Sequence, residues 1–176
     1  MNWTLTGAAS ALLGLAACSP ALNWRSVALP EAALTITLPC KPDHATRKVE
    51  LAGTPVDLSM VGCEADGATF AVSHATLADP AQTGVALAHW RAAVLARLGG
   101  AQAHEVPFVP RNALPLPQSV RTVAQGKGPD GQAVTAQAVW FARTVGPQMQ
   151  LYHAVVYTPR PRPEVADTFF SGLVLP

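Results

Sequence analysis

Residues 119–157 read SVRTVAQGKGPDGQAVTAQAVWFARTVGPQMQLYHAVVY, and this stretch decides the fold class. Between Ala133 and Arg143 every even-numbered residue is apolar, and apolar residues again line one face of 149–157. Such alternation predicts strands. The Gly- and Pro-containing pieces between them, 126–131 and 144–147, predict tight turns. The stretch therefore predicts three consecutive strands, 119–125, 133–143 and 149–157, joined as hairpins.

The same pattern extends toward the N-terminus. Leu34, Ile36 and Leu38 alternate with threonines, which is typical of a half-buried strand. Ala52–Pro55 and Glu64–Gly67 have the composition of turns. Further strands are expected at 24–29, 34–38, 46–51, 56–61 and 69–77.

The spacing of the apolar residues changes after Asp79. Asp79 followed by Pro80 is typical of a helix start, and Gly99-Gly100 of a helix end, so a long helix is expected up to Leu98. A short helix is expected over 164–171. The proline-rich residues 101–118 are expected to be extended connector or edge structure.

These elements predict an α+β fold. We expect a mainly antiparallel sheet of about seven or eight strands, with one long central helix and a short C-terminal helix packed on it, because the strands come in meanders. The chain has 176 residues, and residues 24–176 suit one domain. A net charge of +1 with no cluster of like charges argues against a nucleic-acid partner.

The N-terminal segment has the pattern of an export signal. Leu5 to Ala17 are uncharged and mostly apolar, yet too few to span a bilayer, which needs about 20 residues. Leu15-Ala16-Ala17-Cys18 resembles the lipobox of bacterial lipoproteins. That resemblance implies that the Cys18 thiol receives a diacylglycerol, that the peptide before it is removed, and that the new amine is acylated.

The resemblance divides the chain into a signal peptide, 1–17, a lipidated tether, 18–23, and an envelope domain, 24–176. Ser19 is similar to the second residue of lipoproteins sent to the outer membrane, so we expect the domain to face the periplasm there rather than at the inner membrane. Two other interpretations of the N-terminal segment are an ordinary secretory signal peptide that is cleaved nearby and a helix that is buried in the domain. The segment also lacks the Lys or Arg that usually opens a signal peptide.

Two cysteines remain, Cys40 and Cys63. An even pair in an oxidising envelope indicates a disulfide. The alternatives are free thiols, or a soft-metal site with His44, although zinc prefers four ligands and this set is incomplete.

A weaker resemblance concerns the domain itself. The segments 27–30, 38–42, 69–73 and 166–171 resemble PsbP-like α/β sandwich proteins and related uncharacterised proteobacterial envelope lipoproteins. The resemblance implies an accessory or assembly factor without catalysis, although a shared fold does not determine function.

Three residues are candidates for ligand binding. His74 and His153 follow apolar positions on strands, and their imidazoles could meet if those strands are neighbours. The alternative is a core histidine bonded to backbone or a hydroxyl. Arg91 lies on the apolar face of the long helix. It must extend to solvent, pair with Asp57, Glu64 or Asp66, or bind an anionic ligand.

No catalytic motif is present, so we expect no catalytic residues, no metal and no cofactor. The glycine-rich 126–131 lacks the ending of a phosphate-binding loop and leads into a strand. The sequence predicts a membrane-anchored, non-catalytic module that binds an envelope protein or assists assembly. The alternatives are a small-ligand or metal carrier, and an enzyme with a nucleophile and a base in contact.

Overall fold

The computed structural model describes residues 21–100, 102–128 and 130–176. At its centre lies a seven-stranded antiparallel sheet with the strand order β3-β4-β5-β9-β8-β7-β6. A separate antiparallel pair is formed by β1 and β2. The bounds are β1 Arg25–Leu29, β2 Leu34–Leu38, β3 Asp43–Leu51, β4 Thr54–Ala65, β5 Ala68–Leu77, β6 Ala103–Pro107, β7 Val120–Lys127, β8 Ala133–Val145 and β9 Gln148–Thr158.

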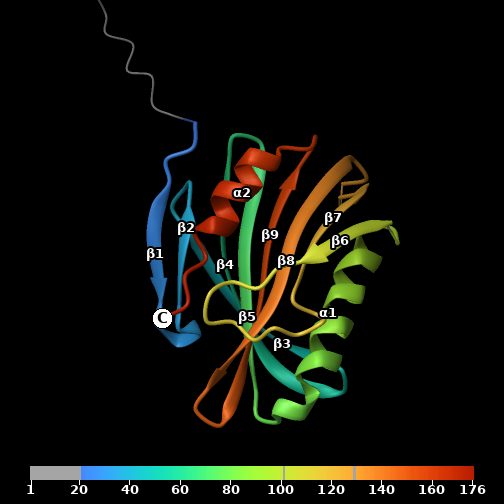
Figure 1. The fold of residues 1–176 in the computed structure, drawn as a ribbon. Helices are drawn as coiled ribbons and strands as arrows, with labels where there is room; N and C mark the ends of the chain where they lie inside the picture. The colour runs from blue at the N-terminus through green and yellow to red at the C-terminus, as the bar shows by residue number, and fades with distance from the viewer. Residues whose placement is uncertain (1–20, 101, 129) are drawn as a thin grey trace, which may run out of the picture.

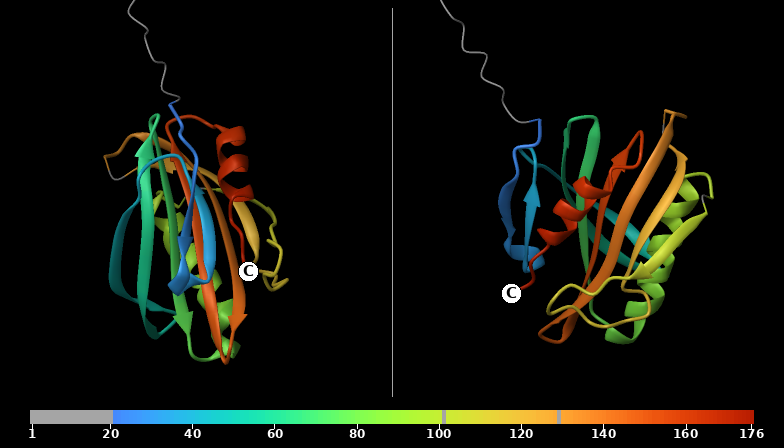
Figure 2. Two further views of the ribbon diagram at one scale, coloured as in Figure 1. Left: turned by 90° about the vertical axis from the view of Figure 1, so that its left-hand side faces the viewer. Right: turned by 45° about the horizontal axis from the view of Figure 1, so that its top comes forward.

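The sheet is covered on both faces (Figure 1). Helix α1, Thr83–Arg97, packs on one face, and the β1–β2 hairpin with helix α2, Pro163–Ser171, packs on the other. The left panel of Figure 2 looks onto the hairpin from outside, with the sheet behind it. The domain is therefore a sandwich of helix, sheet and hairpin-plus-helix.

The two central strands are buried on both faces. Every residue from Thr135 to Ala142 in β8 and from Met149 to Val156 in β9 is buried. The even residues of β9, such as Tyr152, lie in the core under the hairpin, and odd residues, such as Leu151, lie in the core under α1. This double burial explains why β9 is almost continuously apolar.

Helix α1 begins and ends as the sequence predicts. The Asp79 carboxylate accepts a hydrogen bond from the Ala81 amide at 2.9 Å, and a 3-10 turn over Pro80–Gln82 leads into the helix. Gly99 and Gly100 follow the helix with positive φ angles of 81° and 70°, which glycine adopts at little cost. On the inner face of α1, Ala86, Leu87 and Trp90 are buried.

The antiparallel α+β class is confirmed, but the strand count is corrected. The described residues form nine strands in two sheets, whereas seven or eight in one sheet were expected. The ninth strand is β6, an edge strand within the proline-rich segment that was expected to be connector or edge. The signal peptide, 1–17, and Cys18 lie outside the described residues.

Candidate functional site

The structure buries His153 beneath α1. Its imidazole stacks on Trp140 of β8, with ring centroids 4.7 Å apart, and meets the edge of Trp90 of α1 at 5.4 Å. Burial lowers the pKa of His153 from 6.5 to about 3, because a charged imidazole would be desolvated there. Among the described residues its Nε2 has no hydrogen-bond partner. His153 is therefore a neutral core residue packed between two indoles.

His74 lies on the opposite face of the sheet. β5 and β9 are neighbours, but His74 is paired with Tyr152, whereas His153 is paired with Ser73. Because successive side chains of a strand alternate between faces, the two imidazoles point to different cores and do not meet. Burial also lowers the pKa of His74, and the nearby Glu31 partly opposes this shift.

Arg91 is paired within the protein. Its Nε lies 3.3 Å from Oε1 of Glu105 on the edge strand β6. The partners considered from the sequence are elsewhere, since Asp57 pairs with Lys48 and Asp66 with Arg162. Of the alternatives considered for Arg91, the structure shows pairing, but with Glu105 and not with Asp57, Glu64 or Asp66. The position of Glu105 beside α1 follows from the strand order of the sheet.

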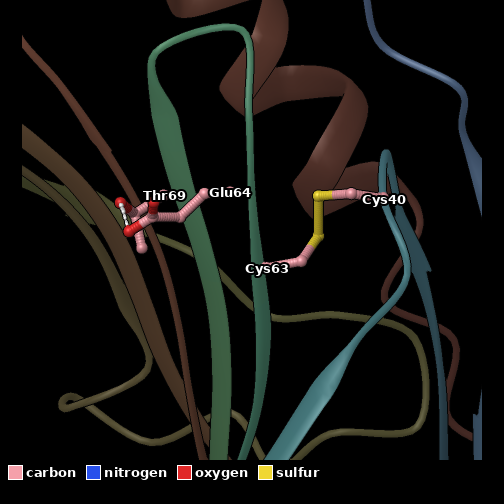
Figure 3. Close-up of a disulfide and its surroundings, with 4 residues drawn as sticks. All are labelled: Cys40, Cys63, Glu64 and Thr69. Carbon is pink, nitrogen blue, oxygen red and sulfur yellow. Dashed lines mark hydrogen bonds between the residues drawn. A yellow bond between two sulfur atoms is a disulfide. The ribbon is translucent and has the colours of Figure 1, made fainter.

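Cys40 and Cys63 form a disulfide (Figure 3). Antiparallel pairing of β3 with β4 sets Asp43 opposite Gly62. Cys63 follows Gly62, and Cys40 lies three residues before Asp43, so the two cysteines are close, with Cα atoms 5.9 Å apart. The bond points toward the β1–β2 hairpin, whereas the side chain of Glu64, the next residue, points to the other face of the sheet. No group of three or more metal-ligating side chains occurs among residues 21–100, 102–128 and 130–176.

A groove opens on the α1 face at one end of the sheet. Its volume is about 1040 Å³, slightly above the usual range of about 300–1,000 Å³ for small-molecule sites. It lies between the C-terminal half of α1, the β4–β5 turn, the β7–β8 turn and the end of β9. Its apolar lining consists of Val94, Leu98, Ala133, Val134, Tyr157 and Pro159.

The path of α1 explains the groove. The amide of Lys127 donates to the carbonyl of Leu98 at 3.3 Å, so the helix end contacts β7. This close approach requires Gly126, because a Cβ there would lie 2.8 Å from the Leu98 Cβ. The β5 surface at the other side of the groove carries small side chains, Thr69 and Ala71, which are only partly buried. The helix therefore leaves this corner of the sheet uncovered.

Both signs of charge line the groove. Arg97 and Lys127 are cationic, and Glu64 and Asp130 are anionic. Within the described part of the chain, none of the four forms a salt bridge. Glu64 instead accepts a hydrogen bond from the Thr69 hydroxyl at 3.4 Å, as Figure 3 shows, and Asp130 accepts one from the Gln132 amide at 3.1 Å.

Tyr157 forms part of the groove floor. Its side chain is partly buried, and burial raises the pKa of its hydroxyl, while the nearby positive charge of Arg97 opposes the shift. Arg97 and Tyr157 both line the groove. The sequence offered no signal for this site, because its residues come from four separate segments of the chain.

A second, smaller hollow of about 350 Å³ lies along β6 and the proline-rich segment. Its lining includes Pro107, Pro115 and Pro117, together with Val106 and Val109. These two valines are 42% and 46% exposed. The hollow is apolar and carries one charged residue, Glu105, which is already paired with Arg91.

No helix among the described residues is long and apolar enough to cross a membrane. No protein-family model matches the chain, and no curated protein matches it. Among solved structures, the chain is similar to a Pseudomonas aeruginosa protein of unknown function, PA94. The two are 15% identical, the match covers 85% of this chain and 92% of that one, and the TM-score is 0.38.

Proposed function

We propose that this chain is a lipid-anchored protein of the bacterial cell envelope that acts by binding rather than by catalysis. The observation that carries the proposal is the disulfide between Cys40 and Cys63. Since the chain has three cysteines, this bond leaves Cys18 as the one thiol available for acylation. Disulfides persist in oxidising compartments, so the bond also supports export.

The position of the chain's entry into the domain supports anchoring at one end. The Asn23 amide donates to the Pro39 carbonyl at 3.1 Å, and Trp24 packs on Phe70 with ring centroids 5.6 Å apart. Figure 1 shows this entry at the same end of the sheet as the β4–β5 turn. Only Ser19 and Pro20 separate Cys18 from Ala21, so a lipid on Cys18 would hold this end within about 10 Å of the membrane surface.

The binding role rests on the groove. Its four charged side chains form no salt bridge within the described residues, and it lies at the end of the sheet where the chain enters. Of the two binding functions considered from the sequence, the groove favours a ligand carrier over a protein-binding module. The groove is a different site from the one considered from the sequence, because its lining does not include His74, His153 or Arg91.

Intact mass and membrane fractionation test the anchoring. We expect protein purified from its own membranes to begin at Cys18, to carry acyl groups, and to be two hydrogens lighter than the reduced chain. Cys18→Ser should leave the membrane fraction, because its hydroxyl does not take the thioether-linked lipid. Ser19→Ala is the matched control and should stay there. An unacylated wild-type mass would refute the proposal.

A further inference from the structure

We propose that the groove beside α1 binds a single-chain phospholipid, with its acyl chain on the apolar floor and its phosphate-bearing headgroup at the charged rim. This inference rests on the proposed anchoring only for the source of the ligand. It names a ligand class for the groove itself, whose chemistry is independent of Cys18.

The floor suits an acyl chain. Val94, Val134 and Tyr157 are each partly buried, so they retain apolar surface that the protein's own packing does not cover. The exposed Ala133 extends this surface to the β7–β8 turn. Covering it with methylene groups is favourable because apolar area leaves water.

The rim suits a headgroup with both charges. Arg97 and Lys127 supply two cations that the described protein groups leave unpaired, and guanidinium and ammonium groups are the usual partners of phosphate. Glu64 and Asp130 supply carboxylates that can accept an ammonium group. A rim of two cations and two anions is complementary to a phosphoethanolamine headgroup, and less so to a simple carboxylate.

The groove lies at the end of the domain that the lipid anchor would hold near membrane phospholipids. The groove is formed in part by Glu64 and Gly67 beside the β4–β5 turn, and Trp24 packs against Phe70 close to the same turn. Figure 1 shows the chain's entry, this turn and the β7–β8 turn at one end of the sheet. A domain held by Cys18 therefore presents the groove toward phospholipids.

Binding is tested with short-chain lysophosphatidylethanolamine, kept below its critical micelle concentration and titrated into the full-length purified protein. We expect saturable binding of one lipid per chain. Ala133→Trp should weaken it about tenfold or more by filling the groove, and Arg97→Glu should do the same by repelling phosphate. Arg111→Glu, an exposed charge outside the groove, is the matched control and should bind like wild type. Equal binding by all four proteins would overturn the proposal.

The site is mapped on unmodified protein, so the result does not depend on a variant folding. A lysophosphatidylethanolamine with a photoreactive acyl chain should label peptides that contain Val94–Leu98 or Ala133–Val134. Labelling of the smaller hollow at Val106 and Val109 instead, or no labelling, would overturn the proposal. Lysophosphatidylglycerol and a fatty acid of equal length serve as comparison probes. Equal labelling by the fatty acid would refute the role given to the headgroup.

Failure of this inference can be told apart from failure of the anchoring. A denaturing mass reports the covalent acyl groups on Cys18, and the lipid titration reports reversible occupancy of the groove. An acylated protein that does not bind the lysophospholipid refutes only the groove assignment. An unacylated protein that binds it refutes only the anchoring.

Discussion

The imidazole of His153 lies parallel to the indole of Trp140, with ring centroids 4.7 Å apart and planes inclined by 21°. Trp90 of α1 contacts the imidazole of His153 from the helix side. This packing excludes water from His153, and burial lowers its pKa to about 3. His153 thus contacts both the neighbouring central strand and the helix, and its burial favours the neutral imidazole.

Stability should therefore fall in acid. Between pH 6.5 and about 3 the unfolded chain binds a proton at His153 that the folded state excludes. The free energy of unfolding, complete above pH 6.5, should then decrease by up to about 1.4 kcal/mol per pH unit as the pH falls through this window. Denaturant unfolding at several pH values measures the slope. His153→Phe keeps an aromatic ring on Trp140 but cannot take the proton, so it should reduce the slope.

His44→Gln is the control for this experiment. His44 is exposed on β3, so its replacement should leave the wild-type slope unchanged. Part of the slope should survive in His153→Phe, because burial also lowers the pKa of His74. Parallel stability curves for wild type and His153→Phe would show that His153 is not the group excluded from protonation.

Gly126→Ala should destabilise the protein. The new methyl group would collide with the backbone and Cβ of Leu98, and overpacking of this kind costs about 1–3 kcal/mol. Gly84→Ala is a matched control, because its methyl group would meet the movable side chain of Gln118 and lies within α1. That control should be neutral or stabilising by up to about 1 kcal/mol. Thermal unfolding of both variants measures the difference, and equal losses would contradict the close approach at Gly126.

Removal of the disulfide should lower the free energy of unfolding. The bond joins residues 23 apart in the sequence, and a loop of that length predicts a loss of about 3 kcal/mol in the Cys40→Ala/Cys63→Ala double variant. A reducing agent should destabilise wild type to a similar extent and leave the double variant unchanged. Denaturant unfolding with and without the reductant measures both effects. If reductant leaves wild type unaffected, the bond does not contribute to stability.

The Arg91–Glu105 ion pair should contribute little to the free energy of unfolding. The two side chains are 23% and 33% exposed, so solvent screens their attraction, and we expect a coupling energy of at most about 1 kcal/mol. A double-mutant cycle with Arg91→Met and Glu105→Gln measures it, and the coupling should shrink as salt is added. A coupling of several kcal/mol that resists salt would instead indicate a desolvated pair.

Much of the fold can be predicted from local pattern. The alternation in 133–143 and 149–157 predicts β8 and β9, and Asp79-Pro80 predicts where the helical segment begins, because these signals lie within a few residues of each other. β6 was harder to assign. Its five residues are mostly exposed and lie within the proline-rich segment 101–118, so hydrophobic periodicity does not mark them.

The candidate site could not be predicted in the same way. Its charged residues, Glu64, Arg97, Lys127 and Asp130, are scattered along the chain. They form one rim only because the helix end meets β7 at Gly126. Knowing that β5 and β9 are neighbours would likewise not have shown whether His74 and His153 meet. The register of β5 on β9 places their side chains on opposite faces of the sheet.

Local sequence patterns predict eight of the nine strands, both helices and the turns between them, and they identify the pair of cysteines that flank one hairpin. These follow from backbone preferences and side-chain periodicity over short distances. The tertiary structure alone decided that β5 lies beside β9, that β8 and β9 are buried on both faces, that Arg91 meets Glu105, and that a groove remains beside α1. The physical reason is that these features depend on strand order and register, which are set by packing between residues far apart in the chain.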